Sequence, residues 1–312
     1  MILITGGTGF VGKALIRRLT ESGLPLRTLI RPSPRSPELP TGVPVEAAVS
    51  SLADERGLRA AMVGVDTVYH LASSERQGAR SSLMDIEIQG TRAVVNAALD
   101  AGVQRLFYVS HLGADRASAY PVLKAKAIAE ETIRRSGLNY TILRSAIVFG
   151  PGDGLTTGIA RVLSALPGVF LMPGGGEVLL QPLWVEDLVT CLAWALDEPD
   201  TLNRTIDIGG PEYLDFRTIV DLVMENSGLR RRIVSVNPPY LRGLTVFLES
   251  TFPRFPTTVY WLDYLAANRT TSLDTMPRIF GLMPSRFSQR LAYLQAAEWR
   301  GSLLRKPSGA RS

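Results

Sequence analysis

A glycine-rich stretch at the start of the chain constrains the fold most strongly. A short apolar run at 2–4 leads through Thr5 into four closely spaced glycines, and a helical apolar pattern follows as far as Leu19. Residues 7–12 read Gly-Thr-Gly-Phe-Val-Gly and match Gly-x-Gly-x-x-Gly. Such glycines permit a tight turn, close approach of backbone to a pyrophosphate, and close packing of helix on strand. Because free N–H groups at the positive end of a helix bind phosphates, this stretch predicts a dinucleotide site. The alternative is a glycine turn without a ligand.

The residue that ends the next apolar strand, 24–30, indicates which dinucleotide is bound. NAD sites usually have Asp or Glu near this place, where it holds the ribose 2′-hydroxyl. This chain has Arg31 instead, with Arg35 four residues on and no acid before Glu38. A guanidinium suits a 2′-phosphate, so we expect NADP(H) to be favoured over NAD(H). The alternative is a solvated loop arginine.

Strand and helix patterns alternate regularly as far as residue 150. Six short strand patterns are each followed by a helical pattern or a turn, at 2–4, 24–30, 45–49, 65–72, 105–110 and 140–143. This alternation predicts an α/β fold with a doubly wound parallel sheet. Ligands of such sheets bind at the carboxyl ends of the strands.

The second half of the chain loses this regularity, which divides the chain into regions. Glycine- and proline-rich clusters at 150–154 and 173–176 interrupt the pattern. We expect residues 1–150 to form the dinucleotide-binding domain, with a return segment at about 183–210. Residues 151–182 and 211–300 then form a smaller, mostly helical substrate or lid domain, and 301–312 a flexible basic tail.

Aromatic residues gather in the helical pattern that begins at Pro238. They are Tyr240, Phe247, Phe252, Phe255, Tyr260, Trp261 and Tyr264. Such a stripe is usually the core of a small domain. The alternative is a face for a membrane surface or a protein partner.

Composition excludes several other classes. The net charge is +5, but only four of the 34 basic residues are Lys and the Arg residues are scattered, so we expect no nucleic-acid partner. The one cysteine, Cys191, lies in an apolar segment and is expected to be a core thiol. With two histidines, we expect no metal site, and His70 lies inside a strand pattern as a core histidine. The chain begins directly in a strand, and no apolar run reaches the roughly 18 residues of a membrane span. We therefore expect a cytoplasmic protein that is either free or peripheral to the membrane.

Tyr120 and Lys124 form the candidate catalytic pair. They lie four residues apart where a helical pattern begins, so their side chains share one helix face. Nine Tyr and four Lys in 312 residues would give about 0.1 such pairs by chance. A neighbouring ammonium group lowers the pKa of a phenol, which then exchanges a proton while hydride moves at the adjacent carbon.

The sequence resembles the short-chain dehydrogenase/reductase superfamily, in its extended and atypical branch. The resemblance rests on TGGTGFVG at 5–12, YHLAS at 69–73, the segment 89–110, YPVLK at 120–124, LRSAIVFGPGDG at 143–154, QPLWVEDL at 181–188 and IGGPE at 208–212. VSHLGA at 109–114 and the C-terminal half are most similar to the branch of the NADPH-holding accessory subunit of respiratory complex I. NmrA-like proteins are more distant relatives.

The resemblance implies a doubly wound Rossmann sheet and specific roles for site residues. Tyr120 would be the proton donor, and Lys124 would hold the nicotinamide ribose. The pyrophosphate would be contacted by Gly6, Thr8, Gly9, Phe10, Val11 and Gly12, and the 2′-phosphate by Arg31. The adenosine side would be contacted by Leu71, Ala72 and Ser73. The nicotinamide would be contacted by Ile147, Val148 and Phe149.

Two departures from the superfamily pattern bear on catalysis. His111 stands where active members have the Ser or Thr that polarises the substrate carbonyl, and Ser110 lies one place early. Pro121 disfavours helical geometry at Tyr120. Three functions therefore stay open: an NADP(H)-dependent oxidoreductase on an unidentified carbonyl or hydroxyl substrate, a non-catalytic NADPH-binding subunit or redox sensor, and an NAD-dependent sugar-nucleotide epimerase or dehydratase.

Overall fold

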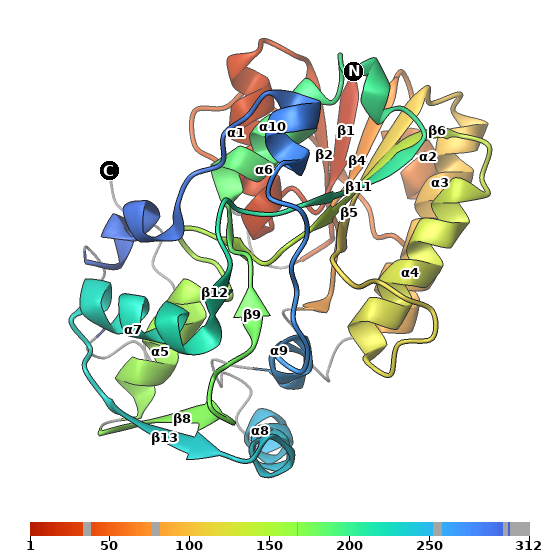
Figure 1. Ribbon diagram of the computed structural model, residues 1–312. Coiled ribbons are helices and arrows are strands. Elements are labelled where there is room, and N and C mark those ends of the chain that lie inside the picture. Colours follow the sequence, from red (N-terminus) through yellow and green to blue (C-terminus); the bar gives the residue numbers. More distant parts are fainter. Residues whose placement is uncertain (34–38, 76–81, 167, 252–257, 296–298, 300–312) are drawn as a thin grey trace.

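A computed structural model describes residues 1–33, 39–75, 82–166, 168–251, 258–295 and 299. Its main feature is a seven-stranded sheet in which every neighbouring pair is parallel (Figure 1). In spatial order the strands are β3 (Glu46–Val49), β2 (Leu26–Ile30), β1 (Ile2–Thr5), β4 (Thr67–His70), β5 (Arg105–His111), β6 (Asn139–Ser145) and β11 (Arg204–Ile208). The order reverses on either side of β1, so the predicted doubly wound α/β sheet is confirmed.

Helices cover both faces of the sheet (Figure 1). One layer contains α1 (Phe10–Glu21), α6 (Val185–Trp194) and α10 (Thr275–Phe280), and the other α2 (Glu55–Ala61), α3 (Gly90–Asp100) and α4 (Pro121–Arg134). In α1 the side chains of Ala14, Leu15, Ile16 and Leu19 are buried against the sheet. The sequence already displays this helical periodicity. Because only residues 6–9 lie between β1 and α1, the start of α1 is at the carboxyl end of β1.

The segment 183–210 returns to the sheet. It contributes α6, which packs against α1, and β11, which pairs along its whole length with β6. Cys191 lies buried in α6, as a core thiol.

A smaller lobe lies below the sheet in the view of Figure 1. Its helices are α5 (Thr156–Ala165), α7 (Phe216–Ser227), α8 (Pro238–Thr251) and α9 (Val259–Tyr264), and its strand pairs are β8 (Val169–Pro173) with β13 (Arg232–Val236) and β9 (Leu179–Leu180) with β12 (Leu214–Asp215). A third hydrophobic core, separate from those on the two sheet faces, holds the lobe together. The strand pairs join segments distant in sequence, which explains why local patterns predicted a mostly helical domain.

A π-helix at Met84–Gln89 leads directly into α3. The predicted tail at 301–312, with Phe252 and Phe255 of the aromatic stripe, lies outside the described residues. Within the part of the chain that the structure describes, no helix is both long enough and apolar enough to span a membrane.

Candidate dinucleotide-binding and active site

Close packing in the loop between β1 and α1 leaves no room for a side chain at two of its glycines. Gly6 has φ +74°, and a Cβ placed there would lie 2.6 Å from the carbonyl carbon of Leu71. A Cβ on Gly12 would overlap the carbonyl oxygen of Gly6. The fold itself therefore requires glycine at these two positions.

Gly9 has a different environment. It is exposed, its φ is −76°, and the nearest atom to an added Cβ would be the Gly6 carbonyl oxygen, at 3.1 Å. Gly9 is also the N-cap of α1, where no side chain caps the helix. A methyl group here would need the Gly6 carbonyl oxygen to shift by a few tenths of an ångström, a smaller change than at Gly6 or Gly12. A phosphate at the helix N-terminus would need the space that a side chain would fill. The loop fits the pyrophosphate of a dinucleotide.

The other expected contacts on the cofactor side lie around this loop. Thr8 is exposed, and Phe10 and Val11 are half-buried in the first turn of α1. Leu71, Ala72 and Ser73 follow β4, and the Ala72 amide donates to Thr5 Oγ1 at 3.4 Å. Arg31 is exposed directly after β2, the strand next to β1. Arg35 and Glu38 lie outside the described residues.

The residues expected beside the nicotinamide divide into two groups. Phe149 is fully buried, and its ring packs against Trp184 and Phe287 at centroid distances of 5.3 and 4.7 Å. It therefore belongs to the core of the smaller lobe. Ile147 and Val148 are half-buried just after β6, and their contact with the nicotinamide stays a prediction.

The two lysines of α4 face in different directions. Tyr120 is the N-cap in an extended conformation, and Pro121 is the first helical residue, as the sequence indicated. Lys124 is exposed, whereas Lys126 is buried. Two residues along a helix correspond to a rotation of about 200°. Lys124 therefore cannot reach the groups that surround Lys126, and the catalytic role of Tyr120 and Lys124 stays a prediction.

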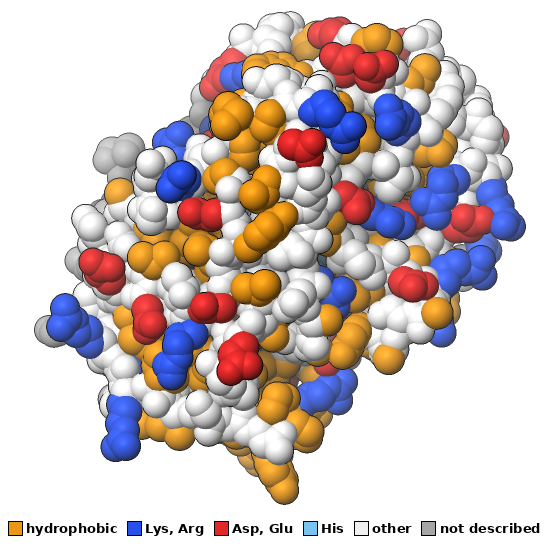
Figure 2. All heavy atoms as spheres, in the orientation of Figure 1, with side chains coloured by type: hydrophobic (Ala, Val, Ile, Leu, Met, Phe, Trp, Pro, Cys, Tyr) orange, Lys and Arg blue, Asp and Glu red, His pale blue; other side chains and the backbone are white. Residues whose placement is uncertain are grey.

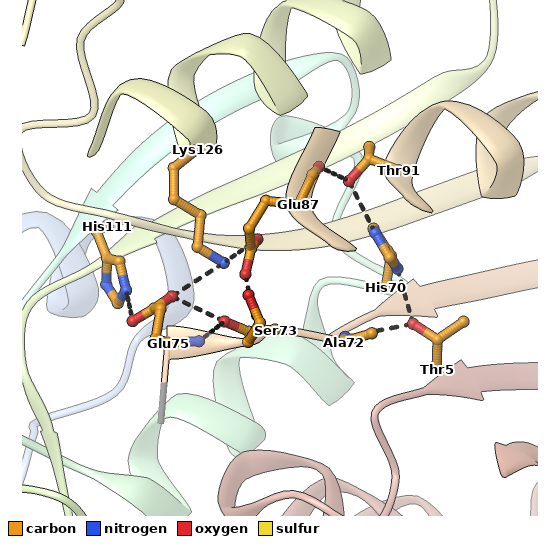
Figure 3. Close-up of polar contacts among 10 residues, drawn as sticks. Thr5, His70, Ala72, Ser73, Glu75, Glu87, Thr91, His111 and Lys126 are labelled. Atoms are coloured by element: carbon orange, nitrogen blue, oxygen red, sulfur yellow. Dashed lines mark hydrogen bonds and ion pairs between the residues drawn. The ribbon is translucent and has the colours of Figure 1, made fainter. Parts of the chain in front are cut away.

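Lys126 contacts two carboxylates, those of Glu87 and Glu75 (Figure 3). Its Nζ lies 3.1 Å from Glu87 Oε2 and 3.3 Å from Glu75 Oε1. Burial works to lower the pKa of Lys126, but the carboxylates of Glu87 and Glu75 raise it well above its ordinary value. Lys126 is therefore a permanent cation.

His70 ties this cluster to the core. Thr91 donates its hydroxyl proton to the Glu87 carbonyl at 2.6 Å, so its oxygen accepts from His70 Nε2 at 2.9 Å. The other ring nitrogen then accepts from Thr5, at 2.7 Å (Figure 3). Burial, and to a lesser extent Lys126, lower the pKa of His70 to about 3, so the ring is neutral. His70 is a core histidine with both ring nitrogens satisfied, as expected.

His111 closes the chain of contacts at the sheet edge. Its Nε2 lies 2.7 Å from Glu75 Oε2 (Figure 3). Burial works to raise the pKa of Glu75, but His111 and Lys126 lower it well below its ordinary value. Because the carboxylate is ionised, it accepts the Nε2 proton and fixes the orientation of the imidazole ring.

Several buried polar atoms beside His111 have no partner among the described residues. They are His111 Nδ1, Tyr264 Oη, and Nε and Nη2 of Arg269. The rings of His111 and Tyr264 meet edge to face at 6.0 Å, and the Arg269 guanidinium lies 5.6 Å from the Tyr264 ring centroid. Burial raises the pKa of Tyr264, so its hydroxyl keeps its proton and serves as a donor. Unpaired buried polar atoms are costly. A bound carbonyl or oxyanion would accept from Tyr264 and Arg269, and from His111 Nδ1 when the imidazole is protonated.

Four residues of this cluster were not predicted as site residues from the sequence: Glu75, Lys126, Tyr264 and Arg269. One signal was available for Lys126. Leu123, Ala127, Glu130 and Ile133 mark the buried face of α4, and Lys126 lies on that face. Glu75 and Arg269 carry no such signal, because the fold brings them to His111 from distant segments.

The sheet, the glycine loop and the uncapped start of α1 together define a dinucleotide-binding protein of the Rossmann type. The chain belongs to the NAD(P)H-binding family, whose family model matches residues 6–162. The expected resemblance to NAD(P)-binding short-chain dehydrogenase/reductase-like proteins is thereby confirmed.

Three relatives show the range of this similarity. The chain is 28% identical to sterol demethylase protein B of Methylococcus capsulatus, with 95% of this chain and 97% of that protein covered. It is 26% identical to the mitochondrial NADH dehydrogenase [ubiquinone] 1 alpha subcomplex subunit 9 of Arabidopsis thaliana, over 86% of this chain and 70% of the subunit. It is also 26% identical to NAD(P)H azoreductase of Xenophilus azovorans, over 95% of this chain and 98% of that protein.

Proposed function

We propose that the protein is an NADP(H)-dependent reductase of carbonyl compounds in which His111, held by Glu75, donates the proton. The observation that carries this proposal is the 2.7 Å contact between His111 and an ionised carboxylate, with the other ring nitrogen buried and unpartnered. Histidine exchanges protons near neutral pH, and an ordered carboxylate is the usual support for an imidazole in this role. The NAD(P)H azoreductase relative supports a reductive reaction.

The residues at the sheet edge divide the chemical tasks. A bound nicotinamide supplies the hydride. Tyr264 and Arg269 provide donors for the substrate oxygen, where negative charge develops. His111 in its protonated form gives the Nδ1 proton to that oxygen, while Glu75 compensates the positive charge of the ring until transfer. The imidazole then regains a proton from water. Lys126 keeps Glu75 ionised and in place.

The preference for NADP(H) over NAD(H) is part of this proposal. Arg31 is exposed directly beyond β2, beside the strand that carries the glycine loop. A 2′-phosphate on the adenosine ribose would meet its guanidinium there.

Steady-state kinetics with a panel of aldehydes and ketones test the proposal. We expect NADPH consumption that falls by about 100-fold or more in His111→Gln, in the range of general acid catalysis. Tyr120→Phe distinguishes the two candidate proton donors. If Tyr120→Phe abolishes turnover and His111→Gln keeps it, the sequence-based pair is the correct one. Arg135→Ala, at the exposed C-cap residue after α4, serves as the surface control.

A second candidate is a non-catalytic NADPH-binding subunit. The observation that favours it is the outer face of α8, where Tyr240 and Phe247 are 76% and 62% exposed. The chain is 26% identical to the NADH dehydrogenase subunit of Arabidopsis thaliana, the same identity as to the azoreductase. Tight NADPH binding without turnover of any carbonyl in the panel, together with sedimentation with phospholipid vesicles, would favour this alternative.

A further inference from the structure

Helix α8 has apolar side chains on both of its sides. On its inner side, Leu241 and Leu248 help to line an apolar cavity of about 140 Å³ in the smaller lobe. On its outer side, the side chains of Tyr240, Val246 and Phe247 are exposed. A helix that is apolar all round is normally covered on every side, so we expect the outer side of α8 to have a partner.

The charged residues of α8 do not interrupt this surface. The helix contains two of them, Arg242 and Glu249. Arg242 Nε donates to Asp263 Oδ1 at 3.0 Å, and the buried Glu249 accepts the Val259 amide at 3.1 Å. Both charged groups are thus engaged by α9, and the outer side of α8 offers apolar contact.

The apolar surface continues onto the neighbouring strand pair. Val169 of β8 and Val234 of β13 are exposed, and Val169 lies opposite Arg232 in the register of the two strands. Residues two apart in a strand share a face, so Arg232 and Val234 lie on the same side of β13. β8 also contacts α8, and the three elements lie at the lower end of the molecule (Figure 1).

This end of the lobe is basic. The segment 228–248 contains four arginines and no acid, and Arg230 and Arg232 are exposed. Figure 2 shows both basic and hydrophobic side chains at this end. Exposed arginines near exposed aromatic groups match the two parts of an anionic bilayer surface, its phosphate groups and the hydrocarbon below them.

We propose that the face formed by the outer sides of α8, β8 and β13 binds to the surface of an anionic phospholipid bilayer. Tyr240 and Phe247 enter the boundary between head groups and acyl chains, and Arg230 and Arg232 contact the lipid phosphates. A second copy of the chain is a poorer partner, because a two-fold contact through this face would oppose two surfaces of the same positive charge.

Bilayer binding is independent of the reductase function proposed above. Vesicle binding alone therefore does not distinguish a reductase from a non-catalytic subunit, whereas turnover of the carbonyl panel does. Failure of either proposal leaves the other one intact.

Sedimentation of the full chain with large unilamellar vesicles tests the electrostatic part of the proposal. We expect saturable binding to vesicles of phosphatidylcholine and phosphatidylglycerol in equal parts, and binding weaker by about tenfold or more to phosphatidylcholine alone. Arg230→Gln and Arg232→Gln should each weaken binding to the mixed vesicles by about fivefold. Arg56→Gln and Arg92→Gln, at exposed arginines of α2 and α3, are the matched controls.

The same assay tests the apolar part. Tyr240→Ser combined with Phe247→Ser should weaken binding to the mixed vesicles by about tenfold or more. These side chains are 76% and 62% exposed, so the substitutions are compatible with the fold. Met283→Ser combined with Val63→Ser is the matched control, because those side chains are 76% and 68% exposed, after α10 and after α2.

A second measurement does not depend on a loss of binding. Phe247→Trp places an indole in the proposed contact, so we expect brominated phosphatidylcholine in the mixed vesicles to quench its fluorescence more than that of the wild type. No binding to the mixed vesicles, or equal binding by the two serine double variants, would overturn the proposal. A dimer of the wild type that Tyr240→Ser with Phe247→Ser dissociates would assign this face to a second copy, and would overturn it as well.

Discussion

Nε2 of His111 lies 2.7 Å from Oε2 of Glu75, and this contact ends a chain of polar contacts that begins in the core. The chain runs from Thr5 through His70, Thr91 and Glu87 to Lys126 and Glu75 (Figure 3). The glycine loop follows Thr5 directly. One hydrogen-bonded assembly therefore positions both the proposed proton donor and the start of the cofactor loop.

Replacing Glu75 tests the role of the carboxylate. Glu75→Gln removes the negative charge that compensates protonated His111 and keeps the size of the side chain. We expect kcat for ketone reduction to fall by about 100-fold with a smaller change in KM, because the charge acts when the proton is transferred. The pH–rate profile should also shift, which loss of packing alone would not cause. An unchanged kcat and profile would contradict the assignment.

The buried lysine is expected to be essential for stability. Lys126→Met leaves Glu87 and Glu75 without their shared cation, so the free energy of unfolding should fall by about 3 kcal/mol or more. Lys124→Met changes an exposed side chain of the same helix and should alter stability by no more than about 0.5 kcal/mol. Urea denaturation measures both. Equal effects of the two substitutions would show that Lys126 is not the buried cation described here.

His70 makes stability depend on pH in a defined window. Its pKa is about 3 in the folded protein and 6.5 in an unfolded chain, so below pH 6.5 the unfolded state binds a proton that the folded state does not. Stability is complete above pH 6.5 and is lost as the pH falls towards 3. Between pH 7.5 and 5.0 the loss should be about 2 kcal/mol.

Urea denaturation at several pH values measures this loss, and the second histidine provides the control. His70→Gln should lack the loss over that range, and His111→Gln should keep it. The same pH dependence in both variants would contradict a neutral, buried His70.

Arg31 is expected to determine the choice of nucleotide. Arg31→Ala should weaken NADPH binding by about tenfold or more, the value of a charged hydrogen bond, and leave NADH binding nearly unchanged. Arg135→Ala, at the C-cap residue after α4, should affect neither. Fluorescence titration with both reduced cofactors measures this difference. Loss of NADH binding in Arg31→Ala would mean that the side chain supports the loop and does not select the phosphate.

The sequence predicted those parts of the fold that local patterns encode. The glycine loop and α1 were correctly predicted because the motif and the helical periodicity lie within twenty residues. The strands up to β6 were correctly predicted for the same reason. The tertiary arrangement of the smaller lobe was not predictable in this way, because β8 pairs with β13 across more than fifty residues.

The candidate site shows the same limit. Tyr120 and Lys124 satisfy a catalytic spacing, but spacing does not state which face of α4 meets the sheet. The structure turns Lys126 inward and leaves Lys124 exposed. Tyr264 and Arg269 reach His111 only through the fold of the smaller lobe.

The most direct test of the account is an NADPH titration of the wild type and of Gly9→Ala by isothermal titration calorimetry. Gly9→Ala requires the Gly6 carbonyl oxygen, 3.1 Å from the added methyl group, to shift by a few tenths of an ångström, and the methyl group occupies space at the start of α1. We predict saturable binding to one site in the wild type and an affinity at least tenfold weaker in Gly9→Ala. Gly243→Ala, at an exposed glycine of α8 with no atom within 4 Å of an added Cβ, should bind as the wild type does. No saturable binding in the wild type, or equal affinity in folded Gly9→Ala, would contradict the account.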